Sequence, residues 1–238
     1  MKVKSLRDCS TCSMLGRSHL GRCDRQTLAH IGPHPANRFK KGQILFFEGN
    51  RPGGLYCIGK GTLKLYKTGS TGKEQIIRLV FPGDILGYRA LIADEPYSAT
   101  AEALEDGEAC FIARDEFRYL LDNNPAFSQA LFKSLCQDLG LMRERLLQMA
   151  QKSARERLAE TLLLLLESGT DCSSARMGSE PRALPVNLPR EDLAGLAGAS
   201  TETVIRLLAE FKHDGLVDFV GKRTYILKPR ELERIAGI

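Results

Sequence analysis

The sequence lacks a hydrophobic run long enough to cross a membrane. Its most apolar stretch, residues 158–166, covers only about two helical turns. The basic residues near the start, Lys2, Lys4 and Arg7, are not followed by the apolar segment of a secretion signal. We therefore expect a cytoplasmic protein without a membrane partner.

Catalytic motifs are missing as well. The 238 residues contain no G-x-S-x-G, no P-loop and no H-E-x-x-H, the signatures of common hydrolases, nucleotide-binding enzymes and zinc proteases. We expect no enzyme. The net charge of +5 arises from 34 basic and 29 acidic residues that are mostly interspersed, which permits a nucleic-acid partner without requiring one.

The sequence contains seven cysteines and no secretion signal. The cytosol keeps thiols reduced, so metal binding or redox chemistry is a better interpretation than a disulfide framework. We expect Cys57 and Cys136, on a predicted strand and a predicted helix, to be small buried hydrophobes, and Cys172 to be a surface thiol in an exposed loop.

Glycine-separated β-branched and aromatic runs fill residues 42–114, a pattern typical of a β-roll or barrel. The period then changes to that of helices. We predict an α+β chain: an N-terminal arm over 1–31, resembling an appendage, a jelly-roll type β-roll sensor domain over 32–123, a dimerisation helix over 124–152 and a winged helix-turn-helix domain over 153–238.

The predicted long helix carries apolar residues at alternating steps of three and four, the seam of a coiled coil. The seam consists of Phe132, Leu135, Leu139, Met142, Leu146 and Met149. Polar neighbours such as Arg143 and Gln148 keep the stripe narrow, which favours a homodimer. The alternative is one helix packed on the core of its own domain.

A helix-turn-helix is indicated by the stretch from Arg190 to Glu210. Two short helices that cross closely need a small residue, a glycine turn and apolar inward positions. Ala194 is the small residue and Gly198 the turn. The inward positions are Leu193, Ala197, Ala199, Val204 and Leu207. A plain pair of packed helices is the alternative, but it would not explain the outward residues.

The outward residues of the second helix are suited to base edges in a DNA major groove. They are Ser200, Thr201, Glu202, Ile205 and Arg206. Arg206 suits guanine, Glu202 a cytosine amino group and Ile205 a thymine methyl, so we expect a G·C pair in the half-site. Glu202 and Arg206 alternatively form a surface ion pair. Lys222 and Arg223, at the tip of a predicted hairpin, are expected to contact phosphate.

This order of β-roll, long helix and winged helix-turn-helix, with T-E-T-V-I-R-L-L in the reading helix, resembles the CRP/FNR family of bacterial regulators. The resemblance implies a cyclic-nucleotide-binding-like β-domain, homodimers on palindromic double-stranded DNA and contact with RNA polymerase. The E-x-x-x-R pair of the family falls on Glu202 and Arg206. Ile205 departs from the serine of the FNR branch and the glycine of the CRP branch, which leaves the half-site open.

The cyclic-nucleotide branch requires a glutamate after a glycine and a later arginine before a serine. This chain has Gly87-Tyr88 and Tyr97-Ser98 instead. Tyr88 offers no carboxylate for the ribose, and Tyr97 offers no guanidinium for the cyclic phosphate. We therefore expect no cyclic AMP.

The FNR branch holds an oxygen-labile [4Fe-4S] cluster on three N-terminal cysteines and one central cysteine. The resemblance implies Cys9, Cys12, Cys23 and Cys110 as the ligands, and oxygen would then lower the dimer population and release DNA. The spacing between Cys12 and Cys23 is longer than in the best-known FNR pattern, although long loops close at little extra entropy.

Other interpretations of these cysteines remain open: a zinc site, a redox dithiol switch or no metal. A regulator could also sense nitric oxide through haem or a small ligand in the β-roll, although the histidines His19, His30, His34 and His213 show no convincing pocket pattern. A purely structural or interaction module would not need the outward residues of the reading helix.

Overall fold

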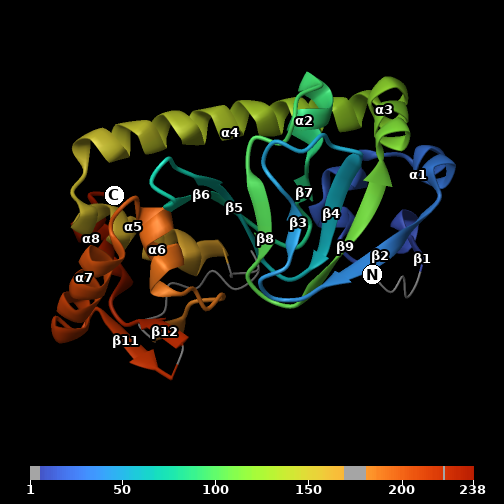
Figure 1. Ribbon diagram of the computed structural model, residues 1–238. Coiled ribbons are helices and arrows are strands. Elements are labelled where there is room, and N and C mark those ends of the chain that lie inside the picture. The colour runs from blue at the N-terminus through green and yellow to red at the C-terminus, as the bar shows by residue number, and fades with distance from the viewer. Residues whose placement is uncertain (1–5, 169–180, 222) are drawn as a thin grey trace. The chain divides into compact units, whose positions relative to one another are not determined.

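The computed structural model describes residues 6–168, 181–221 and 223–238 (Figure 1). The chain forms two compact units. One unit comprises Met1–Gly69 and Ile76–Leu141, and the other comprises Ser70–Gln75 and Met142–Ile238.

The first unit contains two antiparallel sheets. One has the strand order β1-β2-β9-β4-β7 and the other β3-β8-β5-β6. The strands are β1 (Leu6–Asp8), β2 (Pro33–Phe39), β3 (Ile44–Phe46), β4 (Gly54–Lys60), β5 (Leu63–Thr68), β6 (Glu74–Val80), β7 (Ile85–Leu86), β8 (Thr100–Ala103) and β9 (Gly107–Ala113). The predicted β-roll is confirmed.

The five-stranded sheet is covered on both faces. Successive side chains of a strand point to opposite faces, and in β4 Ile58 packs in the core shared with the second sheet. Leu55 and Cys57 pack in the core on the other face. In β9, Ala109 packs in the core shared with the second sheet, and Ile112 packs in the core on the other face. The direction in which each strand residue points therefore decides which core it joins.

The N-terminal arm covers that second face. Its strand β1 pairs with β2, with Leu6 opposite Pro35, and Leu20 and Leu28 are buried in the core beneath the arm. The arm is therefore part of the β-domain core, and the expectation of an appendage is wrong. The strand β2 was not predicted from the sequence, because its two prolines disfavour a central strand.

Short helices complete the first unit. They are the 3₁₀-helices η1 (Cys9–Thr11), η2 (Leu15–Arg17) and η3 (His19–Arg22) and the α-helices α1 (Arg25–Ile31), α2 (Tyr88–Ala93) and α3 (Arg114–Asn123). The long helix α4 (Pro125–Gln151) follows. Asn124 caps it, because its side chain accepts the N–H of Phe127 at 2.9 Å. Phe127 and Leu131 are fully buried against the β-domain.

The second unit is a helical domain with a small sheet of order β10-β12-β11. Its elements are α5 (Ala154–Ser168), β10 (Arg182–Ala183), α6 (Arg190–Ala197), α7 (Thr201–His213), β11 (Val217–Val220), β12 (Arg223–Ile226) and α8 (Pro229–Ala236). The predicted helix-turn-helix and hairpin are present. Among the described residues, no helix is both long and apolar enough to span a membrane.

Candidate nucleic-acid interface and thiol site

The turn between α6 and α7 has the geometry that two closely crossing helices require. Gly198 ends α6 with φ of 61° and ψ of 44°, a left-handed conformation that favours glycine. Leu193 and Val204 are buried on the inward faces of the two helices. Ser200 caps α7 by accepting the N–H of Thr203 at 3.2 Å.

The outward face of α7 presents the residues expected to read DNA. Glu202, Ile205 and Arg206 are exposed, and Thr201 is half-buried at the start of the helix. The sequence offered an ion pair between Glu202 and Arg206 as an alternative, but Arg206 pairs with a different carboxylate. The guanidinium of Arg206 lies 2.6 Å from Glu210, one turn further along α7.

Arg157 of α5 is a structural residue that the sequence analysis missed. Its guanidinium donates to the carbonyl oxygens of Ala197 (2.8 Å) and Gly198 (2.9 Å), and to that of Lys152 (2.5 Å). These bonds satisfy carbonyls at the end of α6. One side chain therefore links the helix-turn-helix turn to the segment between α4 and α5.

The junction of α4 and α5 is held by a second group. Glu160 is buried, and its carboxylate accepts from Gln148 at 2.6 Å and from Lys152 at 2.9 Å. Ser153 and Glu156 form a reciprocal capping box at the start of α5, with distances of 2.6 and 3.3 Å. The S-x-x-E spacing of these residues is a sequence signal from which this cap could have been predicted. The residues that follow α4 are thus tied to the helical domain.

The hairpin expected to contact phosphate pairs from Val217 opposite Ile226 to Val220 opposite Arg223. Arg223 is exposed at the first position of β12 rather than beyond the strands. Lys222 lies outside the described residues.

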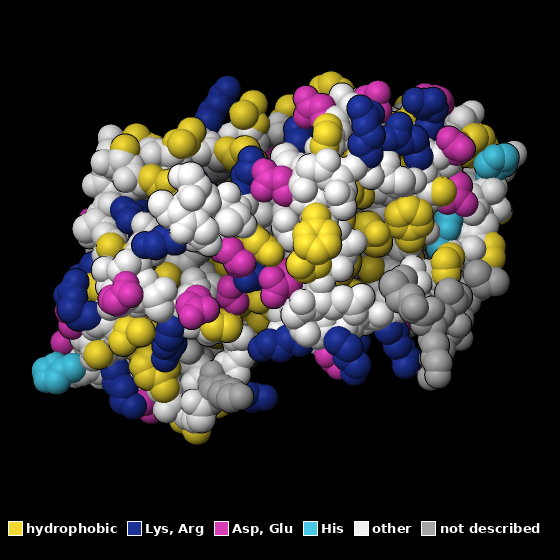
Figure 2. Space-filling model, in the orientation of Figure 1, with side chains coloured by type: hydrophobic (Ala, Val, Ile, Leu, Met, Phe, Trp, Pro, Cys, Tyr) yellow, Lys and Arg dark blue, Asp and Glu magenta, His cyan; other side chains and the backbone are white. Residues whose placement is uncertain are grey.

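The predicted seam of α4 is largely uncovered. Phe132 is 72% exposed and Leu146 70%. Leu139, Met142 and Met149 are also exposed, whereas Leu135 packs partly against the β-domain core. Leu141 and Leu147 are exposed too, so the apolar surface is wider than the predicted stripe. Figure 2 shows hydrophobic side chains along the edge where α4 lies in Figure 1.

The two tyrosines at the positions of the cyclic-nucleotide motif make contacts of their own. Tyr97 stacks on Phe46 with ring centroids 3.9 Å apart and donates to the carbonyl of Gly54 at 3.3 Å. Tyr88 is buried, and its hydroxyl donates to Asp138 of α4 at 3.0 Å. Burial raises the pKa of Tyr88 to about 12, and Asp138 adds to this shift.

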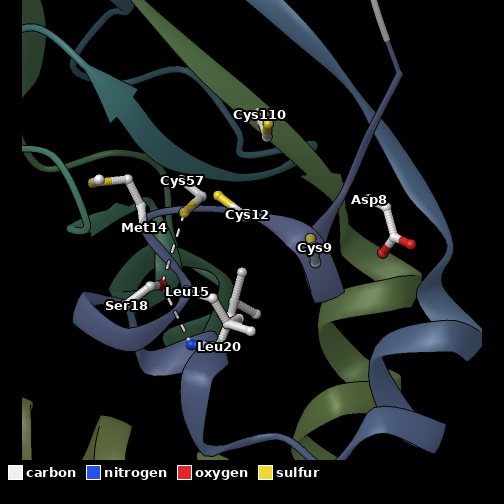
Figure 3. A pocket seen from close by; sticks show the side chains of 9 residues that line it. All are labelled: Asp8, Cys9, Cys12, Met14, Leu15, Ser18, Leu20, Cys57 and Cys110. Atoms are coloured by element: carbon white, nitrogen blue, oxygen red, sulfur yellow. Dashed lines mark hydrogen bonds between the residues drawn. The ribbon is translucent and has the colours of Figure 1, made fainter.

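Thiols gather beneath the arm, on the outer face of the five-stranded sheet (Figure 3). Cys9 and Cys12, at the two ends of η1, line one cavity together with Cys57 of β4 and Cys110 of β9. Cys57 and Cys110 are direct cross-strand partners. The structure thus brings together three of the four cysteines predicted as ligands, and adds Cys57.

The fourth predicted ligand, Cys23, lies elsewhere. It packs against the same core but does not line the cavity. Cys57 is buried as expected, whereas Cys136 is exposed, contrary to the prediction. Cys136 lies on the part of α4 whose apolar face is uncovered. Cys172 falls outside the described residues.

Burial favours the protonated form of Cys9, Cys57 and Cys23. It raises the pKa of Cys9 to about 12, with smaller contributions from the neighbouring thiols Cys57, Cys110 and Cys12. Burial likewise raises the pKa of Cys57 to about 11, although a hydrogen bond from Ser18 opposes the shift. The pKa of Cys23 rises to about 11 through burial and the nearby Asp24. Buried thiols of this kind react slowly, because the thiolate is the nucleophile.

Four cysteine thiols line this cavity, and thiolates are the usual ligands of iron-sulfur clusters. Across the described ranges, no three His, Cys, Asp or Glu side chains are placed to share one metal ion. In a [4Fe-4S] cluster each cysteine binds a different iron, so the thiols need only surround a common space. The cavity has a volume of about 20 Å³, about enough for one water molecule, so a cluster would need more space than this arrangement of the thiols leaves.

The arm contacts the long helix directly. His19 of η3 lies 2.6 Å from the hydroxyl of Ser134 in α4. Asp24, which caps α1, accepts from the side-chain amide of Asn124 at 3.0 Å. Asn124 in turn caps α4, so the arm contacts the residue at which that helix begins.

Two family models match the chain. Residues 36–124 match a cyclic nucleotide-binding domain, and residues 156–235 match a Crp-like helix-turn-helix domain.

Curated relatives of the chain are transcription regulators. The fumarate and nitrate reduction regulatory protein of Vibrio cholerae serotype O1 is 31% identical over 199 residues, which are 84% of this chain and 77% of the relative. The transcriptional activator protein FnrL of Cereibacter sphaeroides is 28% identical over 225 residues, which are 93% of this chain and 88% of the relative. These relatives are not enzymes, which confirms that prediction.

Solved structures share the fold. FixK2 from Bradyrhizobium japonicum has a TM-score of 0.70 at 22% identity, and the match covers 85% of this chain and 96% of that one. A CooA mutant from Carboxydothermus hydrogenoformans has a TM-score of 0.68 at 25% identity, covering 85% of this chain and 88% of that one.

Proposed function

Because the chain belongs to the CRP/FNR family of transcription regulators, we propose that it binds a palindromic DNA site as a homodimer and responds to oxygen through an iron-sulfur cluster. The observation that carries the DNA-binding part is the face of α7. There Glu202, Ile205 and Arg206 are exposed together on a helix that Ser200 caps and Gly198 and Arg157 hold in position.

Base recognition falls to Arg206 and Glu202. A guanidinium that donates two hydrogen bonds to guanine is a strong specific contact, and a carboxylate accepts from cytosine. Arg206 must first leave Glu210, a surface pair that costs little to break. Ser200 and Thr201, at the positive end of α7, and Arg223 and Lys222 in the hairpin are proposed to contact DNA beside these two residues.

The homodimer forms through α4. An apolar face that includes Phe132, Leu139, Met142, Leu146 and Met149 is costly to leave in water, and a second copy of the same helix covers it. Two-fold symmetry then places two reading helices about one turn of DNA apart, which requires a palindromic site. RNA polymerase is the proposed further partner, and the cytoplasm the proposed location.

The cluster is proposed to be held by the arm and the sheet beneath it. Cys9, Cys12 and Cys110, three of the predicted ligands, line one cavity, and Cys23 lies on the adjoining segment. When bound, a [4Fe-4S] cluster supplies an oxygen-labile redox centre. The chain would contribute thiols from the arm and from the sheet, which are distant in sequence, so a bound cluster would link these two parts.

Coupling to the dimer runs through the arm. The contacts of His19 with Ser134 and of Asp24 with Asn124 join the arm to α4. An arm that shifts outward to surround the cluster alters these contacts and reorients the start of α4, which favours association. Without a bound cluster, the arm would keep the packing described above, and the dimer population would be lower.

A second candidate is a family member without a cluster that senses by thiol oxidation. The observation that favours it is the cross-strand pairing of Cys57 and Cys110, which suits a disulfide. The raised pKa of Cys57 opposes it, because few thiolates form there near neutral pH. Cyclic AMP is not the proposed effector, since Tyr88 and Tyr97 bond to the protein itself.

The test is performed on protein purified without oxygen. We expect about four irons and four sulfides per monomer, a broad absorbance near 400 nm and tight binding to a palindromic duplex in a gel-shift assay. Brief exposure to air should remove the absorbance and weaken DNA binding together. Colourless, iron-free protein that binds DNA equally well before and after air would retain the DNA-binding regulator and eliminate the cluster.

A further inference from the structure

Cys57 shares its surroundings with three of the predicted ligands. It lies directly opposite Cys110 on the neighbouring strand, and directly opposed residues of an antiparallel pair have Cβ atoms about 4.5–5.5 Å apart on the same face of the sheet. Cys9 and Cys12 close the same cavity from the arm. Two thiols come from the sheet and two from the arm.

Cys57 also has a hydrogen-bond partner placed for a thiolate. The hydroxyl of Ser18 lies 3.8 Å from its sulfur and is buried. The oxygen of that hydroxyl accepts the backbone N–H of Leu20 at 3.3 Å. Its hydrogen remains to be donated, and a thiolate sulfur can only accept. Hydrogen bonds to ligand sulfurs are among the features that set the potential of an iron-sulfur cluster.

Cys23 has no such arrangement. It follows η3, beside the aspartate that caps α1, and it does not line the cavity. Bringing Cys23 to the other thiols requires the segment between η3 and α1 to move. Cys57 needs no such movement because it is fixed in the sheet.

We infer that Cys57 is the fourth cluster ligand, with Cys9, Cys12 and Cys110, and that Cys23 is not a ligand. This inference rests on the proposed cluster. It gives the site two ligands on rigid strands and two on the arm, so that the arm is the only side that moves when the cluster binds or is lost.

The test compares single variants purified and reconstituted without oxygen. Cys57→Ser should lose most of its iron, acid-labile sulfide and absorbance near 400 nm, whereas Cys23→Ser should keep wild-type amounts. Cys136→Ser is the matched control, since Cys136 is exposed on α4. Circular dichroism and thermal unfolding of the iron-free forms establish that each variant is folded.

Ser18→Ala provides a second measurement that does not depend on removing a ligand. It should keep the iron content and lower the reduction potential, because a hydrogen bond to the sulfur stabilises the reduced cluster. Retention of the cluster by Cys57→Ser, its loss from Cys23→Ser, or an unchanged potential in Ser18→Ala would overturn the inference. Iron-free wild-type protein would instead overturn the proposed cluster itself.

Discussion

Arg206 is restrained by its neighbour before any DNA arrives. Its guanidinium contacts Glu210, and Glu210 also contacts Arg155 at 2.8 Å. Since Arg206 is 66% exposed in its side chain, the pair is solvated and weak. Arg206 therefore stays near the outward face of α7 and can leave Glu210 at little cost.

Replacing Arg206 with alanine should weaken specific DNA binding by about 1–3 kcal/mol and relax the preference at one base pair of each half-site. The reason is the loss of a two-bond contact with guanine. Gel shifts on duplexes that differ at single positions measure both effects. His213→Ala is the control, as His213 is 91% exposed near the end of the same helix. An unchanged base preference in Arg206→Ala would assign the readout to another residue.

A buried histidine makes stability depend on pH. Burial lowers the pKa of His34 below its ordinary value of 6.5, although Glu116, 3.8 Å from Nδ1, acts in the opposite direction. Among the described side chains, the Nε2 atom of His34 is one of two buried polar atoms without a hydrogen-bond partner. The neutral form is therefore the one that fits the fold.

We expect the free energy of unfolding to be fully retained above pH of about 6.5 and to fall as the pH decreases through the lower folded-state pKa. At these pH values, His34 binds a proton more readily in the unfolded protein than in the folded one. Urea unfolding of iron-free protein at several pH values should show a shallower pH dependence for His34→Phe. Equal slopes in the two proteins would show that His34 contributes nothing to it.

At the scale of elements, the turn before α7 is held by a residue outside the helix-turn-helix. Arg157, on α5, donates hydrogen bonds to the carbonyl oxygens of Ala197 and Gly198. Its neighbour Arg155 makes partly exposed ion pairs with Glu210 and Asp214. The two arginines belong to the same turn of α5. Loss of Arg157 removes hydrogen bonds to backbone carbonyls, whereas loss of Arg155 removes ion pairs with two carboxylates.

Arg157→Ala should lower the free energy of unfolding by about 2–3 kcal/mol, because hydrogen bonds from a charged donor contribute more than neutral ones. Arg155→Ala should cost less than about 1 kcal/mol, as expected of exposed ion pairs. Chemical unfolding monitored by circular dichroism measures the difference. Equal costs for both substitutions would show that the carbonyls beside Arg157 find other partners.

At the scale of the whole molecule, the proposed homodimer depends on the apolar face of α4. The uncovered face of α4 has little reason to be apolar unless a second chain covers it. Leu146 is 70% exposed on this face, and Leu164 is 53% exposed on α5. These two leucines differ mainly in the element that carries them.

Leu146→Asp should weaken dimerisation at least about a hundredfold, since each protomer loses a buried leucine and gains a charge at the interface. Binding to a palindromic duplex should fall with it. Leu164→Asp should leave the dimer intact. Sedimentation of both variants at several concentrations, without oxygen, measures the monomer–dimer equilibrium. A Leu146→Asp protein that stays dimeric would place the interface elsewhere.

The sequence by itself determined the features that depend on local pattern. The alternating steps of three and four predicted a long helix, and Gly198 between two short apolar patterns predicted the helix-turn-helix turn. Glycines between β-branched runs predicted the β-roll. Each of these signals acts over a few residues, where backbone geometry and side-chain period are closely related.

Tertiary structure decided which distant residues meet. Strand pairing placed Cys57 beside Cys110, and the alternation of β4 turned Cys57 toward the arm. Packing of α5 on the turn gave Arg157 its role, and β2 formed despite its prolines because the strands on both sides pair with it. Such contacts follow from register and packing between separate segments, which no local pattern encodes.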